Sequence, residues 1–247
     1  MNESARNRVA IVTGVGRAEG LGFEVCRQLA GQRMTVLLTA HKQEQADTLA
    51  HTLREQGFDV VPYALDITDD ASVRQLTDTV RDRYGKLDIL INNAAGVAPF
   101  GEQAATADLT TAQSVLNTTL LGTWRLCQSL LPLLRLSDQG RLVNVSSGAG
   151  SHGDKAFGLT VRNGMGTSYA VAKAALNALT AKLALEEETK QLLINAVCPG
   201  FTATFEGGAA MGARPVAEGA ASIIWAALLP DDGPTGGFFR DGKPLPW

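Results

Sequence analysis

The chain has 247 residues, 45% of them hydrophobic, and a formal net charge of −3 with both signs spread along the sequence. This length and apolar fraction suit one α/β domain, residues 1–247, with a sizeable core. The charge balance excludes the basic surface that nucleic acid or an acidic membrane would require, so neither is expected as a partner. There is no leader segment and no apolar run near ~18 residues, and we therefore expect a cytoplasmic protein without a membrane span.

Cysteine and histidine are both few and scattered. Their spacing fits no metal site, so no metal is expected. The three cysteines, Cys26, Cys127 and Cys198, lie in apolar stretches typical of buried thiols, and we interpret them as core residues rather than redox groups.

The N-terminal part predicts a strand, a glycine-rich turn and a helix. Residues 9–13 are a continuous apolar run, typical of a parallel strand buried on both faces, and the glycine-rich stretch 14–22 follows. This order predicts a phosphate-binding loop, because glycines let the backbone approach the ligand and a helix N-terminus offers free N–H donors. The alternative is an ordinary strand-to-helix loop rich in glycine.

The same alternation continues along the chain. Further strands are predicted at residues 34–40, 60–65, 87–91, 142–145, 192–197 and 237–240, and helices at 43–56, 72–84, 109–136, 169–188 and 215–228. This pattern predicts a single-domain Rossmann-type α/β fold, a doubly wound parallel sheet with helices on both faces. Ligands then bind at the carboxyl ends of the strands. Two irregular stretches there, 148–168 and 201–214, are either substrate loops or plain surface connections.

Tyr169 and Lys173 stand four residues apart in a predicted helix, so their side chains share one face. A nearby ammonium group favours the phenolate, and we expect Lys173 to lower the pKa of Tyr169, as acid/base catalysis requires. Alone, this spacing is weak evidence, since solvated helix faces show it often. A strand ending in Ser147 upstream and the glycine-rich turn favour the catalytic interpretation.

With these pieces in order, nearly the whole chain resembles the short-chain dehydrogenase/reductase family, and within it the carbonyl-reductase type. The stretches that carry the resemblance are LDILINNA at 87–94, CQSLLPLL at 127–134, GRLVNVSS at 140–147 and NAVCPG at 195–200. The resemblance implies that Tyr169 is the proton donor to a carbonyl oxygen, that Lys173 lowers the pKa of the tyrosine and binds the nicotinamide ribose, and that Ser147 holds the substrate oxygen. Two aimed hydroxyls would also stabilise the alkoxide that develops during carbonyl reduction.

Two departures from the family pattern are visible. The glycine-rich turn is two residues longer than usual, and Thr119 stands where the family has a helix asparagine. Either Thr119 takes over that catalytic position, or a local bulge brings in Asn117, or the proton relay is weakened.

The resemblance also implies a set of cofactor-binding residues. They are Gly14, Arg17, Gly20, Leu21, Gly22, His41, Lys42, Asp66, Ile67, Asn93, Ala94, Tyr169, Lys173, Pro199, Gly200, Thr202 and Thr204. No carboxylate follows the second predicted strand, whereas Arg17, His41 and Lys42 could bind a 2′-phosphate, so NADPH is expected and NADH is less favoured. The alternatives are that Lys42 is simply solvated and that Asp66, the implied adenine contact, caps a helix.

We therefore expect an NADPH-dependent reductase of a small aldehyde, ketone or quinone. Two rivals stay open: a cofactor-binding sensor that has lost catalysis, which the replacement by Thr119 favours, and an enoyl reductase of the same fold. A homodimer or homotetramer is expected, because apolar residues on helices 109–136 and 169–188 exceed what one sheet face can bury.

Overall fold

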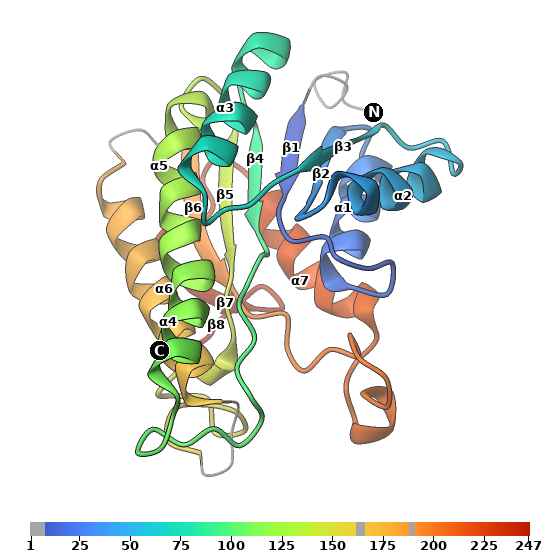
Figure 1. Cartoon of the computed structure of the whole chain (residues 1–247). Helices are drawn as coiled ribbons and strands as arrows, with labels where there is room; N and C mark the ends of the chain where they lie inside the picture. Colours follow the sequence, from blue (N-terminus) through green and yellow to red (C-terminus); the bar gives the residue numbers. More distant parts are fainter. Residues whose placement is uncertain (1–7, 162–165, 188–190) are drawn as a thin grey trace.

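The computed structural model describes residues 8–161, 166–187 and 191–247. At its centre is an eight-stranded sheet in the order β3-β2-β1-β4-β5-β6-β7-β8 (Figure 1). Adjacent strands are parallel except β7 and β8, which form an antiparallel pair. The strands are β1 Val9–Val12, β2 Thr35–Ala40, β3 Val60–Ala64, β4 Ile89–Asn92, β5 Gly140–Val145, β6 Leu192–Val197, β7 Phe238–Arg240 and β8 Lys243–Pro244.

Helices cover both faces of the sheet, as expected of strands that are apolar on both sides (Figure 1). They are α1 Leu21–Gly31, α2 Gln43–Arg54, α3 Asp70–Tyr84, α4 Leu109–Leu116, α5 Thr123–Leu134, α6 Thr167–Leu185 and α7 Val216–Ala227. One core cluster packs α1, α2 and α7 against one face, and a second packs α3, α5 and α6 against the other. The predicted doubly wound fold is therefore confirmed. No helix of the described ranges is long and apolar enough to span a membrane.

Element ends follow local chemistry that hydrophobic periodicity does not report. Helix α3 begins at Asp70 rather than at the predicted residue 72, because the Asp69 carboxylate accepts the backbone N–H groups of Ala71 and Ser72. It ends at Gly85, whose φ of 74° suits glycine. Strand β8 is absent from the predicted elements, because two residues carry no period. The predicted end of the helix at residue 188 lies outside the described residues.

The long helix predicted at 109–136 is continuous in space but not uniform. Between α4 and α5 lies a π-helical turn, Asn117–Gly122. Such a turn accommodates one extra residue and is frequent at functional sites. The helix therefore contains a local bulge, but Asn117 is only half-buried and does not line the cavity described below, whereas Thr119 is fully buried in the turn.

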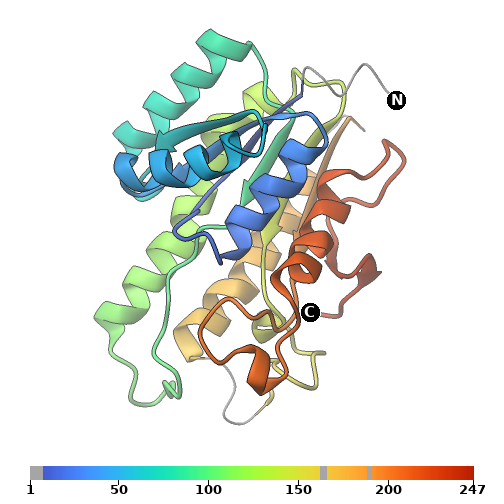
Figure 2. The same ribbon diagram turned by 90° about the vertical axis from the view of Figure 1, so that its right-hand side faces the viewer.

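Three loops gather at the edge of the sheet where the parallel strands end (Figures 1 and 2). They follow β4, β5 and β6 and cover residues 93–108, 146–161 and 198–215. Strand order reverses beside β1, which pairs with β2 on one side and β4 on the other. In open α/β sheets, ligands bind outside the carboxyl ends at such a switch point.

The C-terminal residues also reach this edge. Leu245 donates its backbone N–H to Phe238 at 2.8 Å, and the Ser151 hydroxyl donates to the carbonyl of Pro246. The same Ser151 oxygen accepts the N–H groups of Gly153 and Asp154. The end of the chain is thereby joined to the loop that follows β5.

Candidate active site

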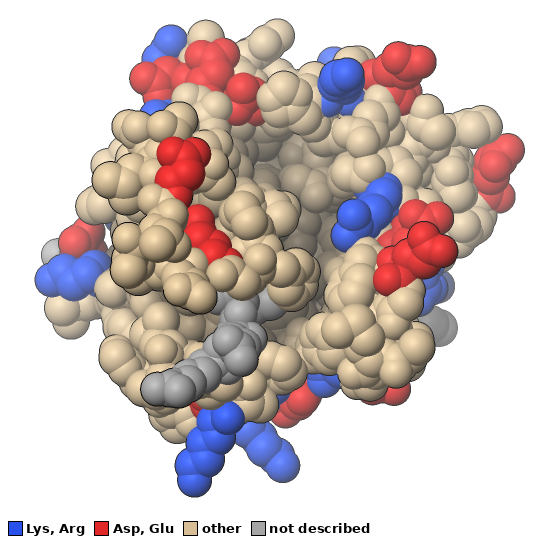
Figure 3. Space-filling view, turned by 60° about the horizontal axis from the view of Figure 1, so that its bottom comes forward, with Lys and Arg blue, Asp and Glu red and all other residues tan. Residues whose placement is uncertain are grey.

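A cavity of about 530 Å³ opens at the carboxyl edge of the sheet (Figure 3). Its walls come from the glycine-rich turn after β1, the loops after β4, β5 and β6, the first turns of α6 and the end of β7. In Figure 3 the hollow is lined mainly by uncharged residues. Segments far apart in sequence therefore meet at one site, as the fold predicts.

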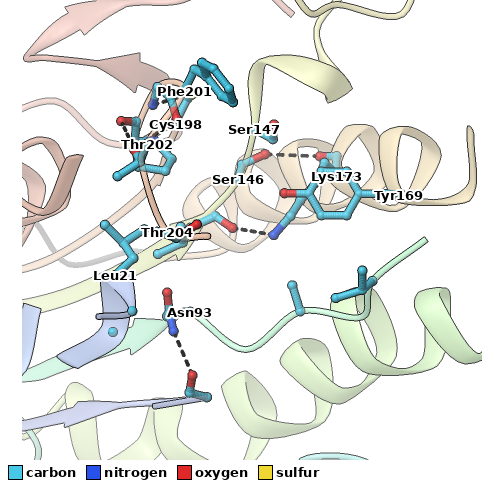
Figure 4. Close-up of a pocket in the computed structure, with 18 of the residues that line it drawn as sticks. Leu21, Asn93, Ser146, Ser147, Tyr169, Lys173, Cys198, Phe201, Thr202 and Thr204 are labelled. Carbon is cyan, nitrogen blue, oxygen red and sulfur yellow. Dashed lines mark hydrogen bonds between the residues drawn. The ribbon is translucent and has the colours of Figure 1, made fainter. Parts of the chain in front are cut away.

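Tyr169 and Lys173 project from α6 into this cavity, across from Leu21 at the start of α1 (Figure 4). The Lys173 ammonium nitrogen lies 5.5 Å from the centre of the Tyr169 ring and donates to the carbonyl oxygen of Val145 at 2.6 Å. The lysine side chain is almost fully buried. It is therefore held between the end of β5 and the tyrosine.

The pKa shifts of Tyr169 and Lys173 both favour the neutral form of the side chain. Burial raises the pKa of Tyr169 to about 12, against an opposing hydrogen bond with Ser147. Burial also lowers the pKa of Lys173 to about 8. The expected lowering of the Tyr169 pKa by Lys173 is not seen in this structure, because burial raises that pKa and Lys173 is not among the groups that oppose the rise.

Two consecutive serines end β5 and have different surroundings. The Ser146 hydroxyl is buried and donates to the backbone carbonyl of Lys173 at 3.3 Å (Figure 4). The Ser147 hydroxyl is partly exposed and accepts the N–H of Ala149 at 3.2 Å, at the start of the short 3₁₀ turn Gly148–Gly150. It also hydrogen-bonds with Tyr169. Ser147 is thus the hydroxyl placed beside the phenol.

The glycine-rich turn leaves backbone exposed to the cavity. Gly14 has a φ of +68°, and a Cβ there would lie 2.6 Å from the Cα of Ala94, so only glycine fits. Helix α1 begins after Gly20 with no side-chain cap on its first N–H groups. Uncapped N–H donors at a helix N-terminus suit phosphate oxygens. The turn therefore fits the pyrophosphate of a dinucleotide.

Hydrogen bonds connect the end of β1, directly before this turn, with the loop after β4. The Thr13 hydroxyl accepts the N–H groups of Asn93 and Ala94, each at 3.0 Å. The Asn93 amide in turn donates to the carbonyl of Thr13 at 2.8 Å and to that of Gly14 at 3.2 Å. Thr13 is missing from the predicted site residues, although its place at a strand end is a usable signal.

Most of the predicted site residues meet in the cavity. Those that line it are Gly14, Arg17, Gly20, Leu21, Gly22, Asn93, Ser147, Tyr169, Lys173, Pro199, Gly200, Thr202 and Thr204. Those that do not are His41, Lys42, Asp66, Ile67, Ala94 and Thr119.

The residues at the ends of β2 and β3 form a separate, more exposed group. The His41 Nε2 lies 3.4 Å from a carboxylate oxygen of Asp66. The Asp66 carboxylate also accepts the hydroxyl and N–H of Thr68, and these hydrogen bonds lower its pKa. Lys42 is exposed directly before α2. Asp69, not Asp66, caps the following helix, so the capping interpretation of Asp66 is wrong.

Thr119 is buried in the π-helical turn, and its hydroxyl accepts the backbone N–H of Gly96 at 3.0 Å. Gly96 itself lines the cavity. Thr119 therefore does not line the cavity but holds the loop after β4 through this hydrogen bond.

Cys198 and Arg240 are among the residues of the cavity wall that are absent from the predicted site. Cys198, expected in the core, is buried but lines the cavity, and its sulfur accepts the N–H groups of Gly148 and Gly200 at 3.2 and 3.3 Å. Arg240, at the end of β7, donates to the same sulfur and pairs with Asp154. Its place at a carboxyl strand end is the one signal that the sequence offers.

Aromatic side chains form one side of the cavity, which we name the aromatic wall and define as Phe157, Phe201 and Phe205. The ring centres of Phe157 and Phe201 are 5.7 Å apart, and those of Phe201 and Phe205 are 6.2 Å apart. The two loops predicted to shape a substrate pocket thus contact each other through these rings. Residues 162–165 of the first loop lie outside the described residues.

The chain is similar to known dehydrogenases and reductases over almost its full length. A sequence model described as short chain dehydrogenase matches residues 8–210. Short-chain dehydrogenase/reductase 1 of Saponaria officinalis is 32% identical over 98% of this chain and 97% of its own length. Carbonyl reductase 1 (NADPH) of Sus scrofa is 32% identical, with coverages of 99% and 96%. The structure of salutaridine reductase from Papaver somniferum has a TM-score of 0.78 and 31% identity, with coverages of 95% and 99%.

A Rossmann-type sheet whose carboxyl edge joins a glycine-rich turn to a serine, a tyrosine and a lysine defines a nicotinamide-dependent oxidoreductase. With residues 8–210 matched, the chain belongs to the short-chain dehydrogenase/reductase family and is similar to its carbonyl reductases. The alignment with the Sus scrofa protein runs over 286 positions, more than the 247 residues here, so that relative contains segments that this chain lacks.

Proposed function

We propose that the protein is an NADPH-dependent reductase of aldehydes, ketones or quinones in which Tyr169 donates the proton. The observation that carries the proposal is the convergence of Ser147, Tyr169 and Lys173 on the cavity that also contains the glycine-rich turn. The relatives named carbonyl reductase and salutaridine reductase support a carbonyl as the reacting group.

The chain's own residues would divide the work between them. The Tyr169 phenol is protonated at neutral pH and would supply the proton that the carbonyl oxygen receives. The Ser147 hydroxyl, beside the phenol, donates to the same oxygen and stabilises the charge that develops there. Lys173 stays in contact with the tyrosine through its anchor on Val145.

The glycine-rich turn and Asn93 would hold the dinucleotide, and the cofactor supplies the hydride when bound. The Lys173 ammonium group has three N–H donors and donates one to Val145. Within the described part of the chain the other two have no partner and could bind ribose hydroxyls. Pro199, Gly200 and Thr202 form the opposite side of the cavity, where the nicotinamide ring would rest.

We propose NADPH rather than NADH as the cofactor because of the charged residues near the end of β2. Residues 40–42 contain no carboxylate, and Arg17 lines the cavity. The Asp66 carboxylate at the end of β3 is engaged by Thr68 and His41. Relatives bear NADPH in their names, and a 26% identical Shigella flexneri structure is described as complexed with NADP.

The test measures cofactor oxidation at 340 nm against a panel of aldehydes, ketones, quinones and α,β-unsaturated carbonyls. Reduction of C=O groups with NADPH is the expected result. Tight cofactor binding without turnover of any compound would favour the sensor, and reduction of the C=C bond alone would favour the enoyl reductase.

We further propose a cytoplasmic homodimer or homotetramer. Leu130 and Leu134 of α5 belong to the chain's own core and so do not support an interface. The better support is exposed apolar surface on the long helix and α6, where Trp124, Leu121, Val171 and Leu185 are 42, 48, 47 and 77% exposed. Light scattering giving the monomer mass of 26.0 kDa would contradict this assembly.

A further inference from the structure

We propose that Glu102 is a positioning residue that fixes the start of α6 and thereby the place of the Tyr169 hydroxyl. The inference rests on the proposed function, because it takes Tyr169 as the proton donor. Glu102 is not among the described residues that line the cavity. It acts from the loop after β4 on the helix that carries the tyrosine.

Helix α6 has no capping side chain of its own. Its N-cap position is Gly166, which has no side chain to accept the first N–H groups of the helix. A larger residue does not fit there, because a Cβ on Gly166 would lie 2.6 Å from the carbonyl oxygen of Pro99 and 2.8 Å from the Cβ of Ala98. A side-chain cap for this helix therefore has to come from another part of the chain.

Glu102 supplies this cap from 66 positions earlier in the sequence. Its carboxylate accepts the backbone N–H of Ser168, the second residue of α6, at 2.6 Å. Its backbone carbonyl accepts the hydroxyl of Thr167, the first residue of α6, at 3.0 Å. A carboxylate at a helix N-terminus makes a charge-assisted hydrogen bond and is attracted by the helix dipole. The two bonds hold the first turn of α6 against the loop after β4.

Tyr169 directly follows Ser168, so a shift of the first turn of α6 moves the tyrosine with it. The Tyr169 ring also packs against a small apolar cluster that contains Ala98, a residue of the same loop as Glu102. The loop therefore holds the tyrosine at two points, through the helix backbone and through the ring. Since a displacement of about 1 Å can lower a rate ~10²-fold, the cap bears on the rate of proton donation.

The turn that carries Glu102 also borders the cavity. The Glu102 N–H donates to the carbonyl of Pro99 at 3.3 Å, and Gly101 has a φ of 77°, so residues 99–102 form a tight turn. Phe100 in this turn lines the cavity and is 78% exposed. A displaced cap would also alter this wall, so KM has to be measured together with kcat.

The test measures kcat and KM at saturating NADPH, with the carbonyl compound of the panel that the wild type reduces fastest. Glu102→Ala should lower kcat about 10- to 100-fold and change KM less. Glu102→Gln keeps an acceptor oxygen and should stay within about fivefold of the wild-type kcat. The control is Asp69→Ala, because Asp69 caps α3, a helix with no described residue in the cavity wall. It should lower stability but leave kcat unchanged.

A double-mutant cycle with Tyr169→Phe separates positioning of the hydroxyl from a general loss of structure. If Glu102 acts through that hydroxyl, adding Glu102→Ala should change the residual kcat of Tyr169→Phe by less than about twofold. A general loss of structure would lower kcat by the same factor with tyrosine and with phenylalanine at position 169. Equal factors in the two backgrounds therefore overturn the proposal.

Glu102→Asp replaces the alanine variant in these measurements if Glu102→Ala does not fold. It keeps the charge but is one methylene shorter, so its carboxylate falls short of the Ser168 N–H. We expect kcat to fall about tenfold or more in this variant. A folded Glu102→Asp protein with the wild-type kcat overturns the proposal.

Failure of this inference can be told from failure of the proposed function. A wild type that reduces no carbonyl compound, or a Tyr169→Phe variant that keeps its activity, overturns the proposed function. If the wild type is active and Tyr169→Phe is not, a wild-type kcat in Glu102→Ala overturns the role of Glu102 alone.

Discussion

The Lys173 ammonium nitrogen lies 5.5 Å from the centre of the Tyr169 ring and directs a hydrogen bond at the carbonyl of Val145. The lysine is thus tied to the end of β5, where Ser147 follows two residues later. A change in the strand end would move all three groups of the site together. The end of β5 therefore fixes the positions of the three side chains relative to one another, without direct contacts between all of them.

Tyr169→Phe should lower kcat by ~10²–10⁴-fold, the usual contribution of a general acid, because only the hydroxyl is removed. Cofactor affinity, measured by fluorescence titration, should stay near the wild-type value. A variant that keeps more than about a tenth of wild-type kcat would show that another group supplies the proton.

Lys173→Met should remove activity and increase the free energy of unfolding, by an amount that depends on pH. Burial lowers the pKa of Lys173 to about 8 in the folded protein, so folding opposes its charged form. Below pH 8 that cost is fully present, and it disappears as pH rises toward the unfolded value near ~10.4. The variant's gain in unfolding free energy over the wild type should therefore shrink from pH 8 upward. Urea titrations across this range check it, and a gain that is constant or grows with pH contradicts it.

Arg17→Ala should weaken binding of NADPH about tenfold and leave NADH nearly unchanged, since the proposed partner of the guanidinium is the 2′-phosphate, which NADH lacks. Calorimetry with both cofactors measures the effect, with Arg74→Ala as a control on an exposed arginine. Equal loss for both cofactors would place Arg17 on the pyrophosphate instead.

Thr119→Val should leave the partly buried N–H of Gly96 without its acceptor, at a cost of about 1 kcal/mol in unfolding free energy. Thr119→Ser keeps the oxygen and should stay close to the wild type. Because Gly96 lines the cavity, kcat should fall in the valine variant only. If serine and valine behave alike, the hydroxyl has no such role.

The fold can be predicted from the sequence where an apolar segment of strand length is followed directly by glycine or by polar residues. The strands β1, β4, β5 and β6 are buried throughout and mostly apolar, and parallel topology then places their ends together, so Ser147, Tyr169 and Gly14 can be assigned to one site. Strand β8 escapes prediction because a two-residue antiparallel pair is determined by tertiary contacts rather than by pattern.

The parts of the site that cannot be predicted depend on three-dimensional neighbours. Cys198 resembles any buried thiol in sequence, since its four hydrogen-bond donors come from Gly148, Gly200 and Arg240, which are distant or ordinary in sequence. The pKa of Tyr169 differs from its expected direction for the same reason. Sequence spacing reports the proximity of Lys173 but not the loss of water around both groups.

The hydrogen bond from Ser151 to Pro246 has a practical consequence for handling the protein. It joins the final residues to the loop that begins at Ser147, and Gly153 of that loop packs so close to the same proline that a Cβ on it would lie 2.5 Å from the proline ring. An affinity tag fused behind Trp247 would pull on this junction. Purification handles are therefore better placed at the other end, and a C-terminal fusion should lower turnover while leaving far-UV circular dichroism unchanged.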